Sequence, residues 1–259
     1  MGTPLLDSFP IYSVYFAIVL FILLSFEVGY QIGKHAQMRS DKEAPGALGP
    51  MVGGILSMLA FVLAFTFSMN ASQHGLRKQN VLDEANAIST AYLRADLIDE
   101  QHGTEIKSLL RDYVDVRVGA NNENIDAVIA KSIELHKLLW AQATSVAITT
   151  PGANTSLLIQ SINNVIDMHE KRVSGALVNR MPAVIRLAVL IIAALTMITL
   201  GTQAGYSGSR RLVAVIPLAL AFAALATVIV DLDRPQRGII KVDQQAMISL
   251  QKNMNRSIK

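Results

Sequence analysis

The chain has 259 residues, of which 51% are hydrophobic and 17% charged, and its formal net charge is +3. It contains no cysteine, which excludes disulfides, thiolate chemistry and cysteine-ligated metal sites. This composition is typical of a small membrane protein and indicates no nucleic-acid partner.

Four uninterrupted apolar stretches are each about as long as the ~20 residues that a helix needs to cross a bilayer. They are residues 10–30, 49–69, 182–202 and 211–231. No Asp, Glu, Lys or Arg occurs from Ala44 to Leu76 or from Leu212 to Val230. Because a charge at mid-bilayer costs about 2.5–3.5 kcal/mol, such gaps are expected of spanning helices. The first stretch is expected to be a permanent span, since no basic leader typical of a signal peptide precedes it.

The segment between the second and third spans has eleven basic and thirteen acidic residues and helical periodicity throughout. Its first apolar stripe is Val81, Ala85, Ile88, Tyr92 and Ala95, on a helix that can continue directly from the second span. Three more helices are expected, their stripes centred on Leu110, Leu139 and Ile162. An even number of helices returns the chain to the membrane.

The predicted fold is therefore all-α, a four-span helical membrane protein with an inserted soluble helical bundle between spans two and three. Residues 1–69 would carry spans one and two, 70–180 a soluble four-helix domain, 181–232 spans three and four, and 233–259 a basic C-terminal tail. The excess of Lys and Arg in the tail suits contact with anionic lipid headgroups.

Four segments carry a resemblance to a known family. They are LAFVLAFTFS in span two, VLDEANAISTAYLRADLI and IKSLLRDYVDVRV in the soluble domain, and DLDRPQRG after span four. From about Gly49 to Val242 the chain resembles the bacterial bestrophin-like membrane proteins, a family of the domain-of-unknown-function class. The resemblance implies kinship with bestrophin anion channels but transfers no catalytic or binding residue. After span four the acidic residues are Asp231 and Asp233, which do not form the acidic cluster of a calcium site.

Span two carries small residues at helical spacing: Gly53, Ser57, Ala60, Ala64 and Ser68. Such a strip lets two helices approach closely, which is its commonest use. In an oligomer the same helix could instead surround an axis and present hydroxyl steps around an aromatic constriction that excludes water. The pore-lining candidates are Ser57, Phe61, Ala64, Phe65 and Ser68.

Charged residues near the span ends are candidates for ion pairs or for a pore mouth. Glu27 shares a membrane face with Arg210, and Arg186 shares the opposite face with Asp231, for which we predict an ion pair. Asp231 and Asp233 could also form a carboxylate ring at a pore mouth. The alternative is that DLDRP is a rigid stop, since Pro235 cannot continue a helix.

No enzymatic motif is apparent, so we expect neither an enzyme nor a metal or cofactor site. The histidines lack partners at the spacing of metal ligands and are interpreted as surface or interfacial residues: His35, His74, His102, His136 and His169. Glu84 and Asn86 are interpreted as solvated or interhelical polar groups.

Lys and Arg in the short segments predict the orientation. Both loops on one side carry basic residues, namely Lys34, Arg39, Lys42, Arg210 and Arg211, whereas Arg234, Arg237 and Lys241 lie on the other. This favours short loops inside the cell and a helical domain outside it, in a bacterial inner membrane.

Two functions remain. The first is a homo-oligomeric ion channel with a pore lined by the second span, whose partners are the lipid bilayer, copies of itself and ions. The alternative is a non-conducting membrane scaffold or sensor whose helical domain binds a partner or ligand.

Overall fold

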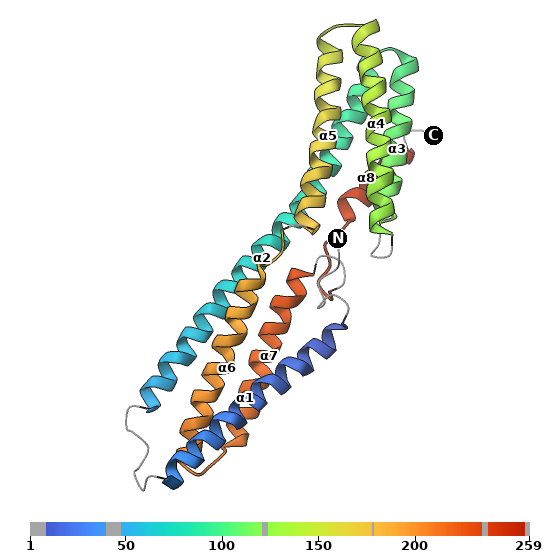
Figure 1. The fold of residues 1–259 in the computed structure, drawn as a ribbon. Helices are drawn as coiled ribbons and strands as arrows, with labels where there is room; N and C mark the ends of the chain where they lie inside the picture. The colour runs from blue at the N-terminus through green and yellow to red at the C-terminus, as the bar shows by residue number, and fades with distance from the viewer. Residues whose placement is uncertain (1–8, 40–47, 121–123, 178, 235–237, 257–259) are drawn as a thin grey trace. The chain divides into compact units, whose positions relative to one another are not determined.

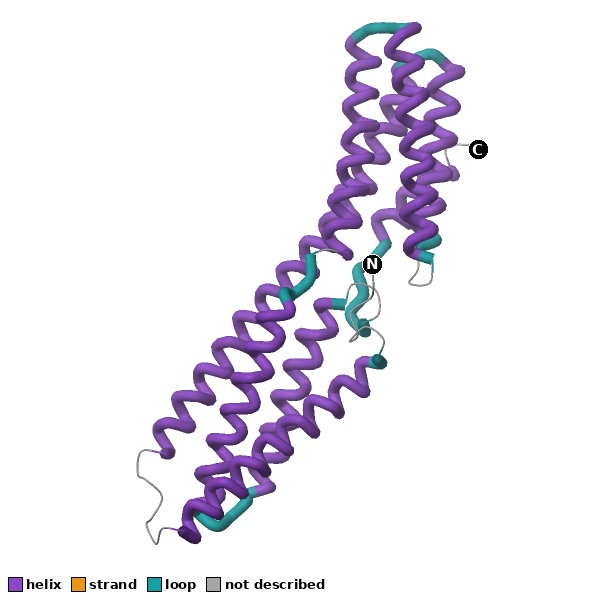
Figure 2. Tube along the Cα trace, viewed as in Figure 1, coloured by secondary structure: helices purple, strands orange, loops and turns teal. Residues whose placement is uncertain are grey.

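The computed structural model describes residues 9–39, 48–120, 124–177, 179–234 and 238–256, in which every regular element is a helix (Figures 1 and 2). The elements in chain order are α1 (Ile11–Arg39), α2 (Leu48–Arg94), the 3₁₀ helix η2 (Ala95–Leu97), α3 (Glu100–Val118), α4 (Ile125–Thr149), α5 (Ala153–Leu177), α6 (Ala183–Tyr206), α7 (Leu212–Asp233) and α8 (Gln245–Arg256). The predicted all-α fold is confirmed. Lys42, Pro235 and Arg237, used above for orientation and for the helix stop, lie outside the described residues.

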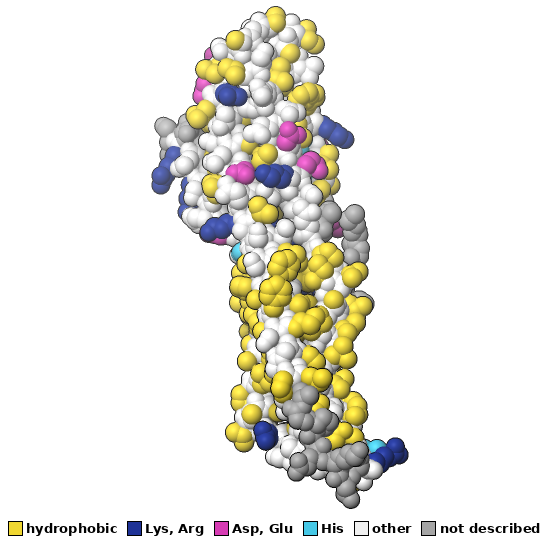
Figure 3. All heavy atoms as spheres, turned by 90° about the vertical axis from the view of Figure 1, so that its left-hand side faces the viewer, with side chains coloured by type: hydrophobic (Ala, Val, Ile, Leu, Met, Phe, Trp, Pro, Cys, Tyr) yellow, Lys and Arg dark blue, Asp and Glu magenta, His cyan; other side chains and the backbone are white. Residues whose placement is uncertain are grey.

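The chain forms two compact units, which are described separately. The membrane unit comprises Met1–Ser72 and Met181–Ile240, and the helical unit comprises Gln73–Arg180 and Lys241–Lys259. Four helices are long and apolar enough to cross a membrane, namely α1, α2, α6 and α7. On the face drawn in Figure 3, hydrophobic side chains cover most of the membrane unit, and the acidic side chains gather on the helical unit. The chain is an integral membrane protein with the four predicted spans.

The membrane unit is held together by direct backbone contact between α1 and α6. Glycines four residues apart face each other on the two helices: Gly29, Gly33, Gly201 and Gly205. A Cβ atom at Gly29 would lie 2.0 Å from the carbonyl oxygen of Ile198, and one at Gly201 would lie 2.1 Å from that of Phe26. Only glycine leaves room for this approach, in which van der Waals contact replaces the hydrophobic effect that lipid does not provide.

The small-residue strip of α2 is not the site of this close packing. Gly53 and Gly54 have no heavy atom within 4 Å of an added Cβ. The opposite side of α2 packs within the membrane unit, where Leu59 and Leu63 are buried with Met181 and Ile229. The strip therefore remains without a partner in a single copy of the described chain.

The helical unit has one apolar core, to which α2, η2, α3, α4, α5 and α8 all contribute. Every residue of the stripe predicted from Val81 to Ala95 is buried. The C-terminal segment, expected to be a tail, joins this core, because Met247 and Met254 of α8 are 0% and 3% exposed. Its charges suggested a lipid-facing tail, yet the methionines recur at helical spacing and make α8 amphipathic.

Enlarging a glycine of the α1–α6 contact should separate the two helices. We expect Gly201→Ala to lower the free energy of unfolding in detergent by about 3 kcal/mol or more, because the added methyl meets rigid backbone atoms. Gly54→Ala is the matched control and should be neutral or stabilising, since alanine is the better helix former and meets no neighbour there. Equal thermal stability of the two variants would contradict the importance of this contact.

Candidate functional site

The pore-lining candidates form one exposed face of α2. Ser57, Ala64 and Ser68 are exposed, and the rings of Phe61 and Phe65 are 72% and 64% exposed. The Ser57 hydroxyl donates to the carbonyl oxygen of Gly53 at 2.9 Å, which leaves its oxygen free to accept. The five candidates therefore share a surface made of two aromatic rings, a methyl group and hydroxyl oxygens, directed away from the core of the membrane unit.

Asp231 and Asp233, in the last turn of α7, organise the backbone around the end of that helix. Asp233 is 8% exposed and accepts hydrogen bonds from the Met181 amide at 2.8 Å and from Arg186 Nη1 at 3.2 Å. Asp231 is 3% exposed and accepts from the amides of Ile239 and Ile240 at 2.9 and 2.8 Å. Protein donors thus occupy both carboxylates, which favours a structural role over a ring at a pore mouth.

The predicted ion pair between Arg186 and Asp231 was wrong in its acidic partner, because Arg186 pairs with Asp233. The order of the spans predicted that both aspartates lie at the same end of the spans as Arg186, but it did not determine which side of α7 each occupies. Residues two apart in a helix point in nearly opposite directions, so only one of the two can face Arg186. Asp231 instead holds the chain that returns after the helix.

The charges at the other membrane face are paired but accessible. Glu27 Oε1 lies 3.0 Å from Arg210 Nη2, and the two side chains are 39% and 48% exposed. The Arg210 guanidinium also lies over the Tyr30 ring, 4.9 Å from its centroid. An exposed pair of this kind contributes at most about 1 kcal/mol.

A buried polar cluster in the helical unit was not predicted. Glu84 of α2 is 0% exposed, accepts a hydrogen bond from the Tyr113 hydroxyl at 2.5 Å and pairs with Arg117 Nε at 3.1 Å and with Arg172 Nη1. His169 lies against the other side of the Tyr113 hydroxyl, with its Nδ1 at 3.0 Å. Of the two roles expected for Glu84, solvated or interhelical, the structure shows the interhelical one, with the side chain fully buried.

His136 and His169 are buried, whereas the sequence led us to interpret both as surface or interfacial residues. They are 6% and 0% exposed, and their ring centroids lie 4.8 Å apart at an interplanar angle of 84°. They come from α4 and α5, so no spacing within one helix could bring them together. The available indication was position: His136 lies one turn before the buried Leu139, and His169 lies one turn after the buried Val165.

Burial controls the protonation states in this cluster. Desolvation lowers the pKa of His136 to about 4, with a smaller opposing effect from Glu84. Desolvation likewise lowers the pKa of His169 to about 4, assisted by the charge of Arg117. Burial, with the charge of Glu84, raises the pKa of Tyr113 well above its usual range. At neutral pH both imidazoles and the phenol are therefore uncharged.

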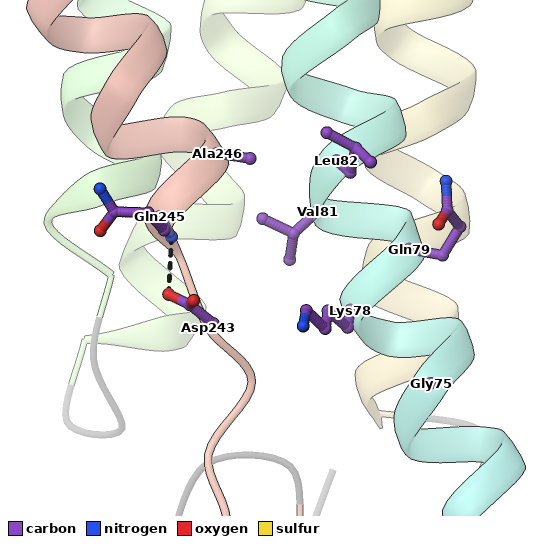
Figure 4. A pocket seen from close by; sticks show the side chains of 8 residues that line it. All are labelled: Gly75, Lys78, Gln79, Val81, Leu82, Asp243, Gln245 and Ala246. Atoms are coloured by element: carbon purple, nitrogen blue, oxygen red, sulfur yellow. Dashed lines mark hydrogen bonds between the residues drawn. The ribbon is translucent and has the colours of Figure 1, made fainter.

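A groove of about 400 Å³ lies in the helical unit between α2 and the segment that leads into α8 (Figure 4). Val81 and Lys78 project from α2 toward this segment. There the backbone N–H group of Gln245 donates a hydrogen bond to Asp243 Oδ1 at 2.8 Å. One cation, one carboxylate and apolar surface could accommodate a small polar ligand. Among the described residues no group of His, Asp and Glu could hold a metal ion.

The pair of Arg186 and Asp233 should show energetic coupling. We expect Arg186→Ala and Asp233→Asn each to lower the free energy of unfolding by about 1–3 kcal/mol, because each leaves a largely buried charge or donor without its partner. Asparagine keeps an acceptor for the Met181 amide, so the Asp233 variant reports mainly on the charge.

Thermal unfolding of the single and double variants in detergent measures this coupling, and the double variant should cost less than the sum of the single ones. Glu27→Gln with Arg210→Ala is the control pair and should be additive within about 0.5 kcal/mol. Additivity of the Arg186 and Asp233 variants would argue against an energetic role for that pair.

Comparisons with known proteins agree with the arrangement of helices. A family model described as a Bestrophin-like domain matches residues 17–247. Two crystal structures of a bacterial bestrophin homologue from Klebsiella pneumoniae, with a threonine in place of an isoleucine or a leucine, are similar in fold. The first has a TM-score of 0.66 and 12% identity, and covers 93% of this chain and 98% of its own. The second has a TM-score of 0.64 and 13% identity, and covers 96% of this chain and 98% of its own.

No curated protein is similar enough in sequence to count as a relative. The structural likeness, at this level of identity, concerns the fold, whereas the family match extends over most of the chain. The chain belongs to the bestrophin-like family.

Proposed function

We propose that this protein is a homo-oligomeric ion channel whose pore is lined by the second span. Bestrophins are known as ion channels, and membership of the family supports a channel at this coarse level. The observation that carries the pore assignment is the exposure of Phe61 and Phe65 in the protomer, on a face that also presents Ser57 and Ser68.

A pore requires several copies of the chain. One side of α2 is occupied by its own protomer through Leu59 and Leu63, so the opposite face has to meet lipid, another copy or a central axis. Identical faces of α2 arranged around a closed symmetry axis would enclose a passage with rings of equivalent side chains. The small residues of the strip permit neighbouring helices to approach that axis closely.

Phe61 and Phe65 would form the gate of this passage. Bulky apolar rings around an axis expel water from a passage only a few ångströms wide, so ions are blocked without a steric plug. The hydroxyl oxygens of Ser57 and Ser68 would hydrate the passage on either side of the rings. For the whole protein we favour the inner membrane of a bacterium, with the helical unit outside the cell, from the basic residues of the short loops.

The alternative function, a scaffold or sensor, draws support from the groove lined by Lys78 and Asp243, which has room for a small ligand. Conduction distinguishes the two proposals. A scaffold has no need of a water-filled axis, and its α2 face would only pack or contact lipid.

The oligomer predicts proximity between copies of the same helix. Because the chain lacks cysteine, Ser57→Cys and Ser68→Cys each introduce a single reporter thiol. We expect oxidation in the membrane to cross-link each variant into dimers, since equivalent positions lie close together around an axis. Phe16→Cys, at a position 68% exposed on α1, is the control and should remain monomeric on denaturing gels.

Native mass spectrometry of the unmodified protein in mild detergent provides an independent measurement, in which we expect a single oligomeric state above the monomer. A purely monomeric spectrum together with absent cross-links would refute both the oligomer and the pore.

The gate predicts a gain of conductance. Phe61→Ala and Phe65→Ala should widen and wet the constriction and give a larger current in planar bilayers than the unmodified protein does. Phe16→Ala, which removes an equally exposed ring from another span, should leave the current unchanged. If Phe61 instead packs in an interface, its loss should create a cavity that costs about 3–5 kcal/mol and should weaken the oligomer without raising the current.

A further inference from the structure

The buried polar cluster of the helical unit joins all of its long helices. Its members are Glu84 from α2, Tyr113 and Arg117 from α3, His136 from α4, and His169 and Arg172 from α5. Arg172 also donates to the Gln244 side chain at 2.6 Å, next to α8. A change in the charge of this cluster therefore acts on α2, α3, α4 and α5 together.

The hydrogen bonds fix the direction of the protons. The Tyr113 hydroxyl donates its hydrogen to Glu84, so its oxygen accepts from the Nδ1–H group of His169. The Nε2 atom of His169 consequently carries a lone pair. This atom and Nε2 of His136 are both buried without a hydrogen-bond partner among the described residues. In His169 this nitrogen is a basic site that a proton could occupy, and in neutral His136 one of the two ring nitrogens is such a site.

Glu84 Oε1 lies 4.0 Å from His169 Nδ1 and carries the one negative charge of the cluster, but that charge is already shared. The Glu84 carboxylate already pairs with both Arg117 and Arg172, so two guanidinium charges and one carboxylate leave the cluster with a net charge of +1. Protonation of either imidazole would raise this charge to +2 in a site shielded from water. Charges of like sign at such distances repel strongly when water is excluded.

We propose that this cluster is a proton-responsive switch, in which protonation of His136 or His169 on acidification loosens the packing of α4 and α5 against α2 and α3. Loosening admits water to the imidazolium and separates it from Arg117. The switch is a property of the helical unit and does not depend on the channel proposal.

The sign follows from the protonation equilibria. We call the packed arrangement of the helical unit the closed state and the loosened arrangement the open state. Burial lowers the pKa of both histidines from the ordinary 6.5 to about 4 in the closed state. Between pH 6.5 and pH 4 the open state therefore binds protons that the closed state does not. The closed packing is therefore fully stable above about pH 6.5 and loses stability as the pH falls toward 4. From pH 7 to pH 5 one such histidine raises the open-to-closed ratio about 20-fold.

Hydrogen–deuterium exchange of the full-length protein in detergent, at pH 7 and pH 5, tests the proposal. After correction for the intrinsic pH dependence of amide exchange, protection of α4 and α5 should fall at least about 20-fold in the unmodified protein, the effect of one histidine. The double variant His136→Gln and His169→Gln should keep its protection at pH 5. His102→Gln, which affects a histidine of the same unit bonded to the exposed Asp99, should behave like the unmodified protein.

Exchange of the imidazole C2 hydrogens in the unmodified protein gives a measurement that needs no variant. His136 and His169 should titrate with midpoints below about pH 5. Midpoints near the ordinary value, undiminished protection at pH 5, or an equal loss in the unmodified protein and the double variant would each overturn the proposal.

Discussion

Lipid offers no hydrogen-bond partner, so every polar backbone group of a spanning segment has to be satisfied within that segment. All of the spans are consequently helices, and their hydroxyl side chains bond to the preceding turn: Thr66 to the carbonyl oxygen of Val62 at 2.6 Å, and Thr196 to that of Ile192 at 2.7 Å. The same solvent removes the usual force for packing helices together, since a lipid tail is as apolar as leucine. Close contact has to come from shape, which the glycines of α1 and α6 provide.

In the helical unit water is the solvent, and the hydrophobic effect is the main force that packs the helices together. Apolar stripes on α2, α3, α4 and α5 are buried with the methionines of α8. A polar group can enter such a core only with its partners, because an unpaired one costs about 1–3 kcal/mol. Glu84 meets this condition through a tyrosine and two arginines. Arg77, equally buried, donates instead to the carbonyl oxygens of Gly175 and Asn179 at the end of α5.

Patterns within one helix could be predicted from the sequence, and contacts between helices could not. The charge-free spans and the stripe from Val81 to Ala95 depend only on local periodicity, and both are present in the structure. The strip on α2 and the glycines on α1 look alike as patterns. Which of the two packs closely against another helix depends on which helix lies beside it, and that is determined by the fold. The same limit explains why the end of the spans at which Arg186 lies could be predicted but its partner Asp233 could not. It also explains why the contact between His136 and His169, which come from different helices, was not predicted.

Burying the charged groups of the cluster costs free energy, and this cost requires an explanation. Apolar side chains of the same volume would make a core at least as stable, because removing several charges from water is rarely repaid in full by their attraction. What the cluster provides is specificity. Glu84 of α2, Arg117 of α3 and Arg172 of α5 form the ion pairs, so a shift of any of these three helices by one turn would leave Glu84 or an arginine buried and unpaired. An apolar stripe tolerates such a shift far better, since one leucine can replace another. The arrangement that pairs every charge is therefore separated from its competitors by a larger energy gap than packing alone would give.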